Sequence, residues 1–228
     1  MSLFERYLPN PPFKKWGLFQ GTAPASSGGQ GLFSNQVAAT GAGTNSNLLS
    51  STNGYGLTFV SGATNGNNAG WRVNRAMTMR SFNPVFMARF RLPIAAPTNG
   101  DYRMFIGFSS NHPTADPTGD DPLATFSGYM LVAITTNTNF MIAKNDGTSS
   151  TYTSTGITLD ANLHTLILIA DEANTRWGWS LDGGAVTYDT TFIPASTTAL
   201  GFAAETQVAT AAAARNIEQY IMFIGQDK

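Results

Sequence analysis

Alternation of apolar and polar residues organises the chain from about residue 54 onward and predicts β-strands. Within Val85–Leu92 (VFMARFRL), every second position is apolar, and two arginines occupy positions between them. A period of two residues is typical of a strand with one face on a core and the other in water. Further strands are predicted over residues 57–60, 103–108, 129–134, 140–143, 157–159, 163–170, 176–181, 185–188, 200–204 and 217–224, and near residue 152.

The stretch 163–184 predicts a complete antiparallel hairpin. Its first strand is a dense apolar run that is too short and too branched for a helix. In its second strand, Trp177, Trp179 and Leu181 alternate with small or polar residues, so we expect both tryptophans in the core. The run Asp182-Gly183-Gly184 supplies the positive φ angles that a tight turn requires before the next strand.

The first 53 residues follow neither the strand period nor the helix period. They begin with five aromatic residues interleaved with prolines and cations. They continue from residue 21 to 53 as a segment rich in Gly, Ser and Asn with a few apolar residues, which predicts loop and short strand. The aromatic residues are Phe4, Tyr7, Phe13, Trp16 and Phe19. We predict an extended N-terminal arm and connecting segment over residues 1–53, followed by a β-sandwich over residues 54–228. The aromatic side chains need burial, either on their own domain or on a neighbouring subunit.

About eleven short strands with turn signals between them predict an all-β fold, a two-sheet antiparallel sandwich. A propeller would require internal repeats, and the sequence contains none. The one helix candidate is the alanine-rich stretch 206–216, for which a short surface helix and a loop both remain open.

Composition excludes several classes of partner and bond. Only 12% of the residues are charged and the formal net charge is −1, so nucleic acid is not an expected partner. The absence of cysteine excludes disulfides and Cys-ligated zinc. No apolar run approaches the roughly 18 residues of a membrane-spanning helix, so no membrane partner is expected. The N-terminal stretch also lacks the apolar run of a signal peptide.

Two groups of strands carry a resemblance to a known family. The series His164-Thr-Leu-x-Leu-Ile-x-Asp171, followed by Trp177-x-Trp179-x-Leu181-Asp182-Gly183, resembles the hairpin of concanavalin A-like and laminin G-like jelly rolls. The run ARFRLP…YRMFIGFSS (88–110), with the strand 128–134, is similar to paired strands of jelly rolls in virion proteins of tailed bacteriophages. The resemblance covers residues 54–228. It implies a concanavalin A-like jelly roll, and it specifies fold far more than activity.

The sequence contains no complete motif of the catalytic sites that we considered. A glycoside hydrolase needs two carboxylates at a fixed separation, and the four glutamates are isolated from any Asp on the same strand face. A Ser-His-Asp hydrolase has only His112 and His164 to draw on, and no Gly-x-Ser-x-Gly turn is present. Because His164 lies in a strand pattern, we expect it to be a packed or hydrogen-bonded structural residue. We therefore predict no enzymatic activity and no catalytic residues.

A loop over residues 111–122 gathers carboxylates between three prolines. Asp116, Asp120 and Asp121 offer the oxygen ligands that Ca²⁺ prefers. Asp beside Pro or Gly is also ordinary turn chemistry, which we favour here. A calcium site on these three residues therefore stays an open expectation, and no other cofactor is expected.

Exposed aromatic side chains stack on sugar rings, and the jelly-roll resemblance implies carbohydrate binding as one possible activity. Three aromatic residues in polar surroundings are candidates for such a site: Tyr55, Trp71 and Tyr152. Isolated aromatic residues in β-proteins are usually packed instead, so each candidate competes with a place in the core.

Together these features predict a non-enzymatic structural protein of a tailed-phage virion. The arm would dock a homo-oligomer onto other virion proteins, the major capsid or tail protein, in a head decoration or cement role. Such a protein would be assembled in the bacterial cytoplasm and released by lysis. The alternatives are a tail fibre or receptor-binding protein, and a carbohydrate-binding module that recognises host surface glycans.

Overall fold

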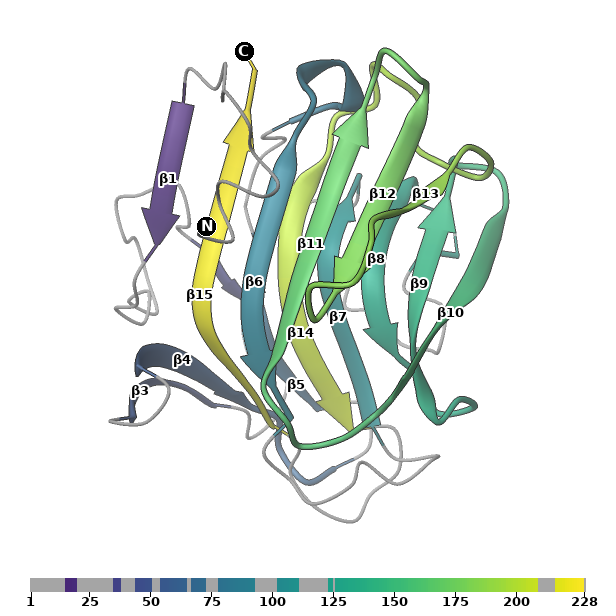
Figure 1. The fold of residues 1–228 in the computed structure, drawn as a ribbon. Coiled ribbons are helices and arrows are strands. Elements are labelled where there is room, and N and C mark those ends of the chain that lie inside the picture. Colours follow the sequence, from purple (N-terminus) through teal and green to yellow (C-terminus); the bar gives the residue numbers. More distant parts are fainter. Residues whose placement is uncertain are drawn as a thin grey trace.

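The computed structural model describes residues 15–19, 35–37, 44–50, 54–64, 67–72, 78–92, 102–110, 123–124, 126–208 and 216–227. Within these ranges the regular secondary structure is β-strand, apart from a single 3-10 turn, η1 (Arg80–Phe82). Two antiparallel sheets face each other (Figure 1). No helix in this part of the chain is long and apolar enough to cross a membrane.

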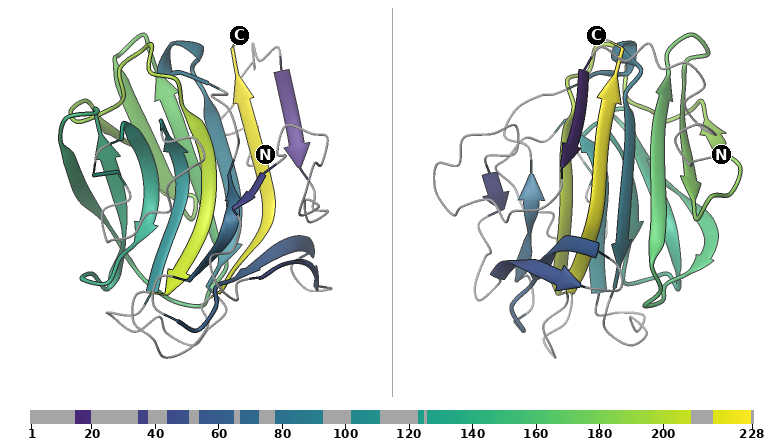
Figure 2. Two further views of the ribbon diagram at one scale, coloured as in Figure 1. Left: turned by 180° about the vertical axis from the view of Figure 1, so that it is seen from behind. Right: turned by 60° about the vertical axis from the view of Figure 1, so that its left-hand side comes forward.

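The first sheet has eight strands and holds the C-terminal strand near its centre. Its order is β13 (Thr187–Asp189), β12 (Arg176–Leu181), β11 (His164–Asp171), β6 (Val85–Arg91), β15 (Asn216–Gln226), β4 (Gly54–Val60) and β3 (Thr44–Ser50). The eighth strand, β1 (Lys15–Phe19), pairs with the last residues of β15, whereas β4 pairs with its first residues. Figure 2 shows both partners beside the long C-terminal strand.

The second sheet has seven strands, and it covers the inner face of the first. Its order is β10 (Ser150–Thr158), β9 (Asn139–Asn145), β8 (Gly128–Ala133), β7 (Tyr102–Ser109), β14 (Gly201–Val208), β5 (Asn68–Arg72) and β2 (Asn35–Val37). Every pairing in both sheets is antiparallel. The predicted all-β, two-sheet antiparallel sandwich is therefore confirmed.

Aromatic side chains from both sheets form the core between them. Phe86 of the first sheet lies 4.1 Å, centroid to centroid, from Phe202 of the second. Trp177 lies 5.4 Å from Phe108 and 5.3 Å from Tyr129, again across the two sheets. Such inter-sheet aromatic pairs combine a large buried area with favourable ring geometry. The prediction that Trp177 and Trp179 belong to the core is confirmed.

Most predicted strands are present, and the exceptions have a common cause. The stretch 157–159 is not a separate strand, because β10 runs through to Thr158. The strands β1 and β5 were not predicted, since their sequences lack clear alternation. The strands β2 and β3 lie in the segment predicted as loop and short strand, where the abundance of Gly, Asn and Ser gave no bounds. Both ends of the helix candidate 206–216 belong to strands, β14 and β15, and the residues between them lie outside the described part.

Residues 1–53, predicted as an arm and connecting segment, contribute three strands to the sandwich. β1 extends the first sheet at β15, and β2 extends the second sheet at β5. β3 forms a hairpin with β4 across residue 53, so the strand order has no boundary there. Phe4, Tyr7 and Phe13 lie outside the described residues. Trp16 and Phe19 lie in β1, although their side chains are outside the described part.

Gly107 allows the second sheet to form a close contact between β7 and β8. A Cβ at this position would lie 2.5 Å from the Tyr129 carbonyl oxygen and 2.7 Å from the Met130 Cα. Its φ of +153° is also one that side-chain-bearing residues rarely adopt. Both neighbouring atoms belong to the backbone, so the clash cannot be relieved by rotating a side chain.

We expect Gly107→Ala to lower the free energy of unfolding by about 2 kcal/mol, the range of other overpacked core positions. Urea denaturation of the purified variant measures this. Gly184→Ala is the matched control, because the nearest atom to its Cβ is the Leu181 carbonyl oxygen at 3.4 Å. That variant should stay within about 0.5 kcal/mol of the parent. Equal stabilities for both variants would contradict the close contact.

Candidate functional site

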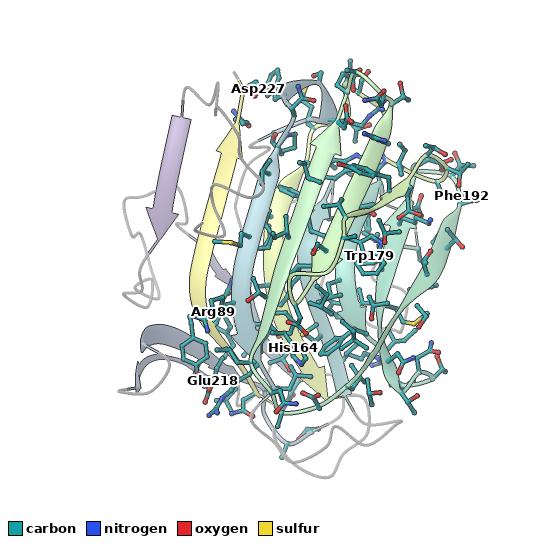
Figure 3. All side chains as sticks on the ribbon, viewed as in Figure 1. Arg89, His164, Trp179, Phe192, Glu218 and Asp227 are labelled. Carbon is teal, nitrogen blue, oxygen red and sulfur yellow. The ribbon has the colours of Figure 1, made fainter. Side chains whose placement is uncertain are left out.

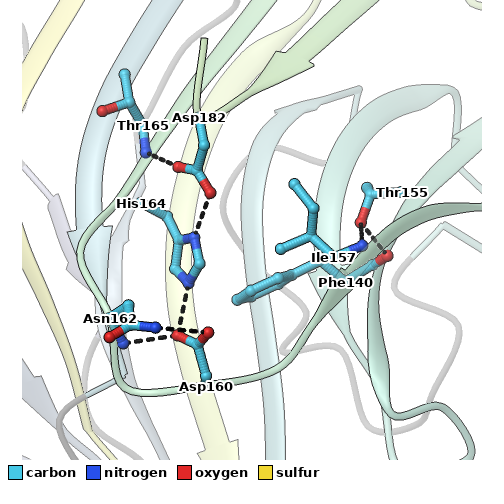
Figure 4. A network of polar contacts seen from close by, with 8 residues as sticks. All are labelled: Phe140, Thr155, Ile157, Asp160, Asn162, His164, Thr165 and Asp182. Atoms are coloured by element: carbon cyan, nitrogen blue, oxygen red, sulfur yellow. Dashed lines mark hydrogen bonds and ion pairs between the residues drawn. The ribbon is translucent and has the colours of Figure 1, made fainter. Parts of the chain in front are cut away.

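The histidine of the predicted hairpin is held between two carboxylates. His164 begins β11, and its Nδ1 lies 2.8 Å from Asp182 Oδ2, at the turn that follows β12. Its Nε2 lies 3.0 Å from Asp160 Oδ1, in the loop that precedes β11 (Figure 4). The ring is buried and packs against Phe90 and Phe140, with centroid distances of 5.6 and 4.9 Å.

Both carboxylates of this arrangement have further partners. The second oxygen of Asp182 accepts a hydrogen bond from the Thr165 backbone N–H at 2.8 Å. Asp160 accepts hydrogen bonds from the backbone N–H and the side-chain amide of Asn162 (Figure 4). Partial burial acts to raise the pKa of Asp160, but the hydrogen bonds from Asn162 and His164 outweigh it and lower the pKa below its ordinary value.

This geometry makes His164 a structural residue. A general base in a Ser-His-Asp site needs one ring nitrogen directed at a nucleophile. Here both nitrogens already contact carboxylates, and the ring is enclosed by phenylalanines. The expectation of a packed, hydrogen-bonded histidine is confirmed. The other histidine, His112, lies outside the described residues.

A second polar group lies between the sheets at their open edge. Lys144 of β9 contacts Asp189 of β13 through Nζ and Oδ1, and the Tyr129 hydroxyl donates to Asp189 Oδ2 at 2.6 Å. The side chains of Lys144 and Asp189 are only 8% and 11% exposed. Because these residues come from opposite sheets, the contact connects the short strand β13 to the second sheet.

Next to this edge, two large apolar side chains are exposed. Tyr188 in β13 is 39% exposed and Phe192, in the loop that follows, is 43% exposed. They are the exposed large apolar residues of the described part of the chain. Figure 3 shows Phe192 projecting beyond the end of β13. We call Arg176, Tyr188 and Phe192 the β13 rim.

The backbone of the exposed residue Phe192 has a strained conformation. Its φ of +56° lies in the left-handed region, which is uncommon for a residue with a bulky side chain. The next two residues, Ile193 and Pro194, are buried and fix the loop to the sandwich. An exposed aromatic residue in a strained conformation on an anchored loop is a candidate contact residue.

Arg176 supports the tyrosine of the rim. Its guanidinium carbon lies 3.7 Å from the centroid of the Tyr188 ring, a cation–π contact. The ring also lies against Gly178, where a Cβ would come within 2.8 Å of it. Arg176 is in turn paired with Asp171 at 2.8 Å. Burial acts to raise the pKa of Asp171, but hydrogen bonds from Asn174 and Arg176 lower it, so the pair carries no net charge near neutral pH.

The three residues predicted as glycan contacts lie in three different strands. Tyr55 lies in β4 opposite Leu49, and Trp71 lies in β5 opposite Ala204, with both aromatic side chains outside the described part. Tyr152 lies in β10 and packs, half-buried, against a second apolar cluster on the outer face of the seven-stranded sheet. That cluster contains Phe105, Leu123, Met130, Val132, Ile134, Met141 and Ala143.

The predicted calcium ligands Asp116, Asp120 and Asp121 lie outside the described residues. Among the residues that are described, no group of three or more His, Asp or Glu side chains is arranged to hold a metal ion.

The β13 rim was not predicted from the sequence. Tyr188 was counted as the end of a strand, and Phe192 lies in a stretch, TTFIP, without alternation. One available signal was an aromatic residue between two threonines and a proline, which is unusual in a polar loop. The left-handed backbone at Phe192 has no sequence signal.

The fold is similar to those of several solved structures. A protein of unknown function from Shewanella oneidensis MR-1 matches with a TM-score of 0.64 at 16% identity, over 99% of this chain and 95% of that one. The carbohydrate recognition domain of Emp47p matches with a TM-score of 0.59 at 10% identity, over 83% and 90%. A carbohydrate esterase of the Shiga toxin-encoding bacteriophage phi24B matches with a TM-score of 0.55 at 14% identity, over 93% and 100%.

These similarities place the fold among lectin-like jelly-roll sandwiches, as the resemblance to concanavalin A-like domains implied. At such low identities they establish architecture alone. No protein-family model matches the sequence, and no curated protein matches it.

The lowered pKa of Asp160 predicts how stability depends on pH. The charge of Asp160 stabilises the folded state fully above the ordinary carboxyl pKa of about 3.9, and this contribution is lost as the pH falls through the lowered pKa. We expect Asp160→Asn to reduce the free energy of unfolding near pH 6 by less than about 1 kcal/mol, because the side chain is 38% exposed.

Urea denaturation of parent and variant from about pH 6 to pH 3 measures this difference, which should shrink below about pH 4. Asn162→Ala removes a donor to the same carboxylate and should act in the same direction. A difference that stays constant on acidification would contradict the role assigned to the charge.

Proposed function

We propose that this chain is a non-enzymatic carbohydrate-binding domain that holds a neutral glycan at the β13 rim. The observation that carries the proposal is the exposure of Tyr188 and Phe192, next to a sandwich whose other described large apolar side chains are buried or half-buried. Sugar rings present C–H faces that stack on aromatic rings, and Phe192 offers its ring to solvent. The similarity in fold to a carbohydrate recognition domain supports this proposal.

The charges around the rim favour a neutral ligand. Arg176 is paired with Asp171, and Lys144 is paired with Asp189, so neither cation is left to attract an anionic sugar. Exposed hydroxyls flank the two aromatic residues along the chain, at Thr187, Thr190 and Thr191. Hydroxyl groups both donate and accept, which suits the hydroxyls of a neutral sugar.

The described residues offer no catalytic arrangement to accompany this surface. Both nitrogens of His164 contact carboxylates. Asp171, which contacts Arg176 of the rim, and Asp189, which follows Tyr188 along the chain, are each paired with a cation. A glycosidase would need one carboxylic acid and one free carboxylate on either side of a bond. Binding without chemistry is therefore the function that the geometry supports.

We further propose that the domain is displayed on a tailed-phage particle, where recognition of a host glycan would be an adhesive role. Its support is the similarity in fold to a protein encoded by bacteriophage phi24B, over 93% of this chain. Docking through the N-terminal aromatic residues, homo-oligomer formation and release by lysis belong to this proposal. A head decoration role and a tail fibre role both fit it.

Substitutions at the rim test glycan binding directly. We expect Phe192→Ala to weaken binding to a neutral glycan, first identified on a glycan array, at least about tenfold, or ~1.4 kcal/mol, as for other contact hot spots. Phe192→Tyr keeps the ring and should bind like the parent. Calorimetry with the array-selected glycan measures both.

Tyr152→Ala is the control on the opposite sheet and should leave the affinity unchanged. Loss of binding in Tyr152→Ala but not in Phe192→Ala would move the site to the outer face of the seven-stranded sheet. An array that responds only to sialylated or uronic-acid glycans would contradict a neutral ligand.

The virion proposal is tested by removing residues 1–14, because β1 begins at Lys15 and pairs with the sandwich. The truncated chain should stay folded, as judged by circular dichroism, but should no longer co-sediment with the phage particles that bind the full chain. Full co-sedimentation would contradict docking through Phe4, Tyr7 and Phe13, the aromatic residues that the truncation removes.

A further inference from the structure

The polar contact at the open edge of the sandwich joins an amine and a carboxylate in an enclosed place. Lys144 shares its strand face with Phe140 and Ile142, both core residues, so its side chain enters the space between the sheets. Asp189 pairs with Trp177 across β12 and β13 and faces the same space. The two side chains are in direct contact and about nine-tenths buried.

Aromatic groups surround this contact on the core side. The Tyr129 hydroxyl donates to the second oxygen of Asp189 at 2.6 Å, and the Tyr129 ring stacks on Trp177. Burial first, and then the charge of Asp189 and its hydrogen bond, raise the pKa of Tyr129 far above its ordinary value. The hydroxyl therefore stays protonated and continues to donate to the carboxylate.

Two physical effects favour joining these groups. Removing two charges from water costs several kcal/mol per ion, and a neutral amide avoids that cost. Groups fixed in contact also react as if at very high concentration, because the entropy of bringing them together has already been lost on folding. Exclusion of water from the surroundings favours a condensation whose by-product is water.

We propose that Lys144 and Asp189 condense into an intramolecular amide that covalently links the two sheets. The ammonium transfers a proton to the carboxylate, and the freed amine attacks Asp189 Cγ, forming the N–C bond. Oδ2, held by the Tyr129 hydroxyl, accommodates the developing negative charge and becomes the amide oxygen. The bond from Cγ to Oδ1 breaks, and Oδ1 leaves as water with two protons that came from Nζ. No oxidant, reductant or cofactor enters the balance.

Such a bond would fix the part of the chain that carries the rim. β13 has only three residues and pairs only with β12 among the described strands. The amide would tie it to β9 in the opposite sheet, closing a loop between residues 45 positions apart. The chain has no cysteine, so a disulfide cannot perform this task. Tyr188 and Phe192 lie on either side of the linked residue.

The mass of the intact protein tests the proposal without any substitution. Under denaturing conditions, the purified full chain should weigh one water molecule less than its sequence. Trypsin should fail to cleave after Lys144, and the digest should contain a branched peptide in which that lysine carries the segment with Asp189. A mass equal to that of the unmodified sequence would overturn the proposal.

Three variants locate the bond. Lys144→Arg keeps a cation that can still contact Asp189 but cannot form the same amide, and it should have the full sequence mass, as should Asp189→Ala. Retention of the lower mass in either variant would place the lost water elsewhere and overturn the assignment. Tyr129→Phe should slow the mass change in a time course after refolding. An unchanged rate would contradict the role of the tyrosine hydroxyl in amide formation.

Discussion

Contact between aromatic side chains of the two sheets is the interaction on which the rest of this structure depends. Phe86 packs on Phe202 and Trp177 packs on both Phe108 and Tyr129, so each ring pair joins one sheet to the other. Because this layer excludes water, any polar group that enters it needs a partner inside the protein. His164 and Lys144 both enter it, and they meet this need in different ways.

The histidine between Asp160 and Asp182 connects consecutive segments of one hairpin, whereas the lysine paired with Asp189 connects the two sheets. The first arrangement positions a turn and leaves no nitrogen for chemistry. The contact between Lys144 and Asp189 lies next to the rim that carries the exposed aromatic residues, since Asp189 directly follows Tyr188. The surface proposed to bind sugar is thus adjacent to an interior polar contact, and a substitution that removes this contact should also alter the conformation of the rim.

The sequence predicted those parts of the fold in which residue pattern and tertiary environment agree. The hairpin with Trp177 and Trp179 was predicted because alternation, an apolar run and a Gly-rich turn all indicate the same structure. The bounds of β2 and β3 were not predicted, because both strands are rich in polar residues and lack clear alternation, and β2 depends on β5, a partner far along the chain. The β13 rim was missed for a related reason. The exposure of Phe192 and its backbone conformation depend on how its loop is fixed to the sandwich, which no local sequence pattern indicates.

The position of β15 has a consequence for how the chain reaches this structure. The strand lies between β6 on one side and β4 and β1 on the other, although it is the last strand along the chain. Until a ribosome has released residues up to about 226, the strands β1 and β4 have no partner through which to join β6. The eight-stranded sheet can therefore close only after β15 has been synthesised, and until then the earlier strands present unpaired edges. The low charge of the chain gives those edges little electrostatic protection, so its yield in a cell should depend on how quickly the last strand arrives.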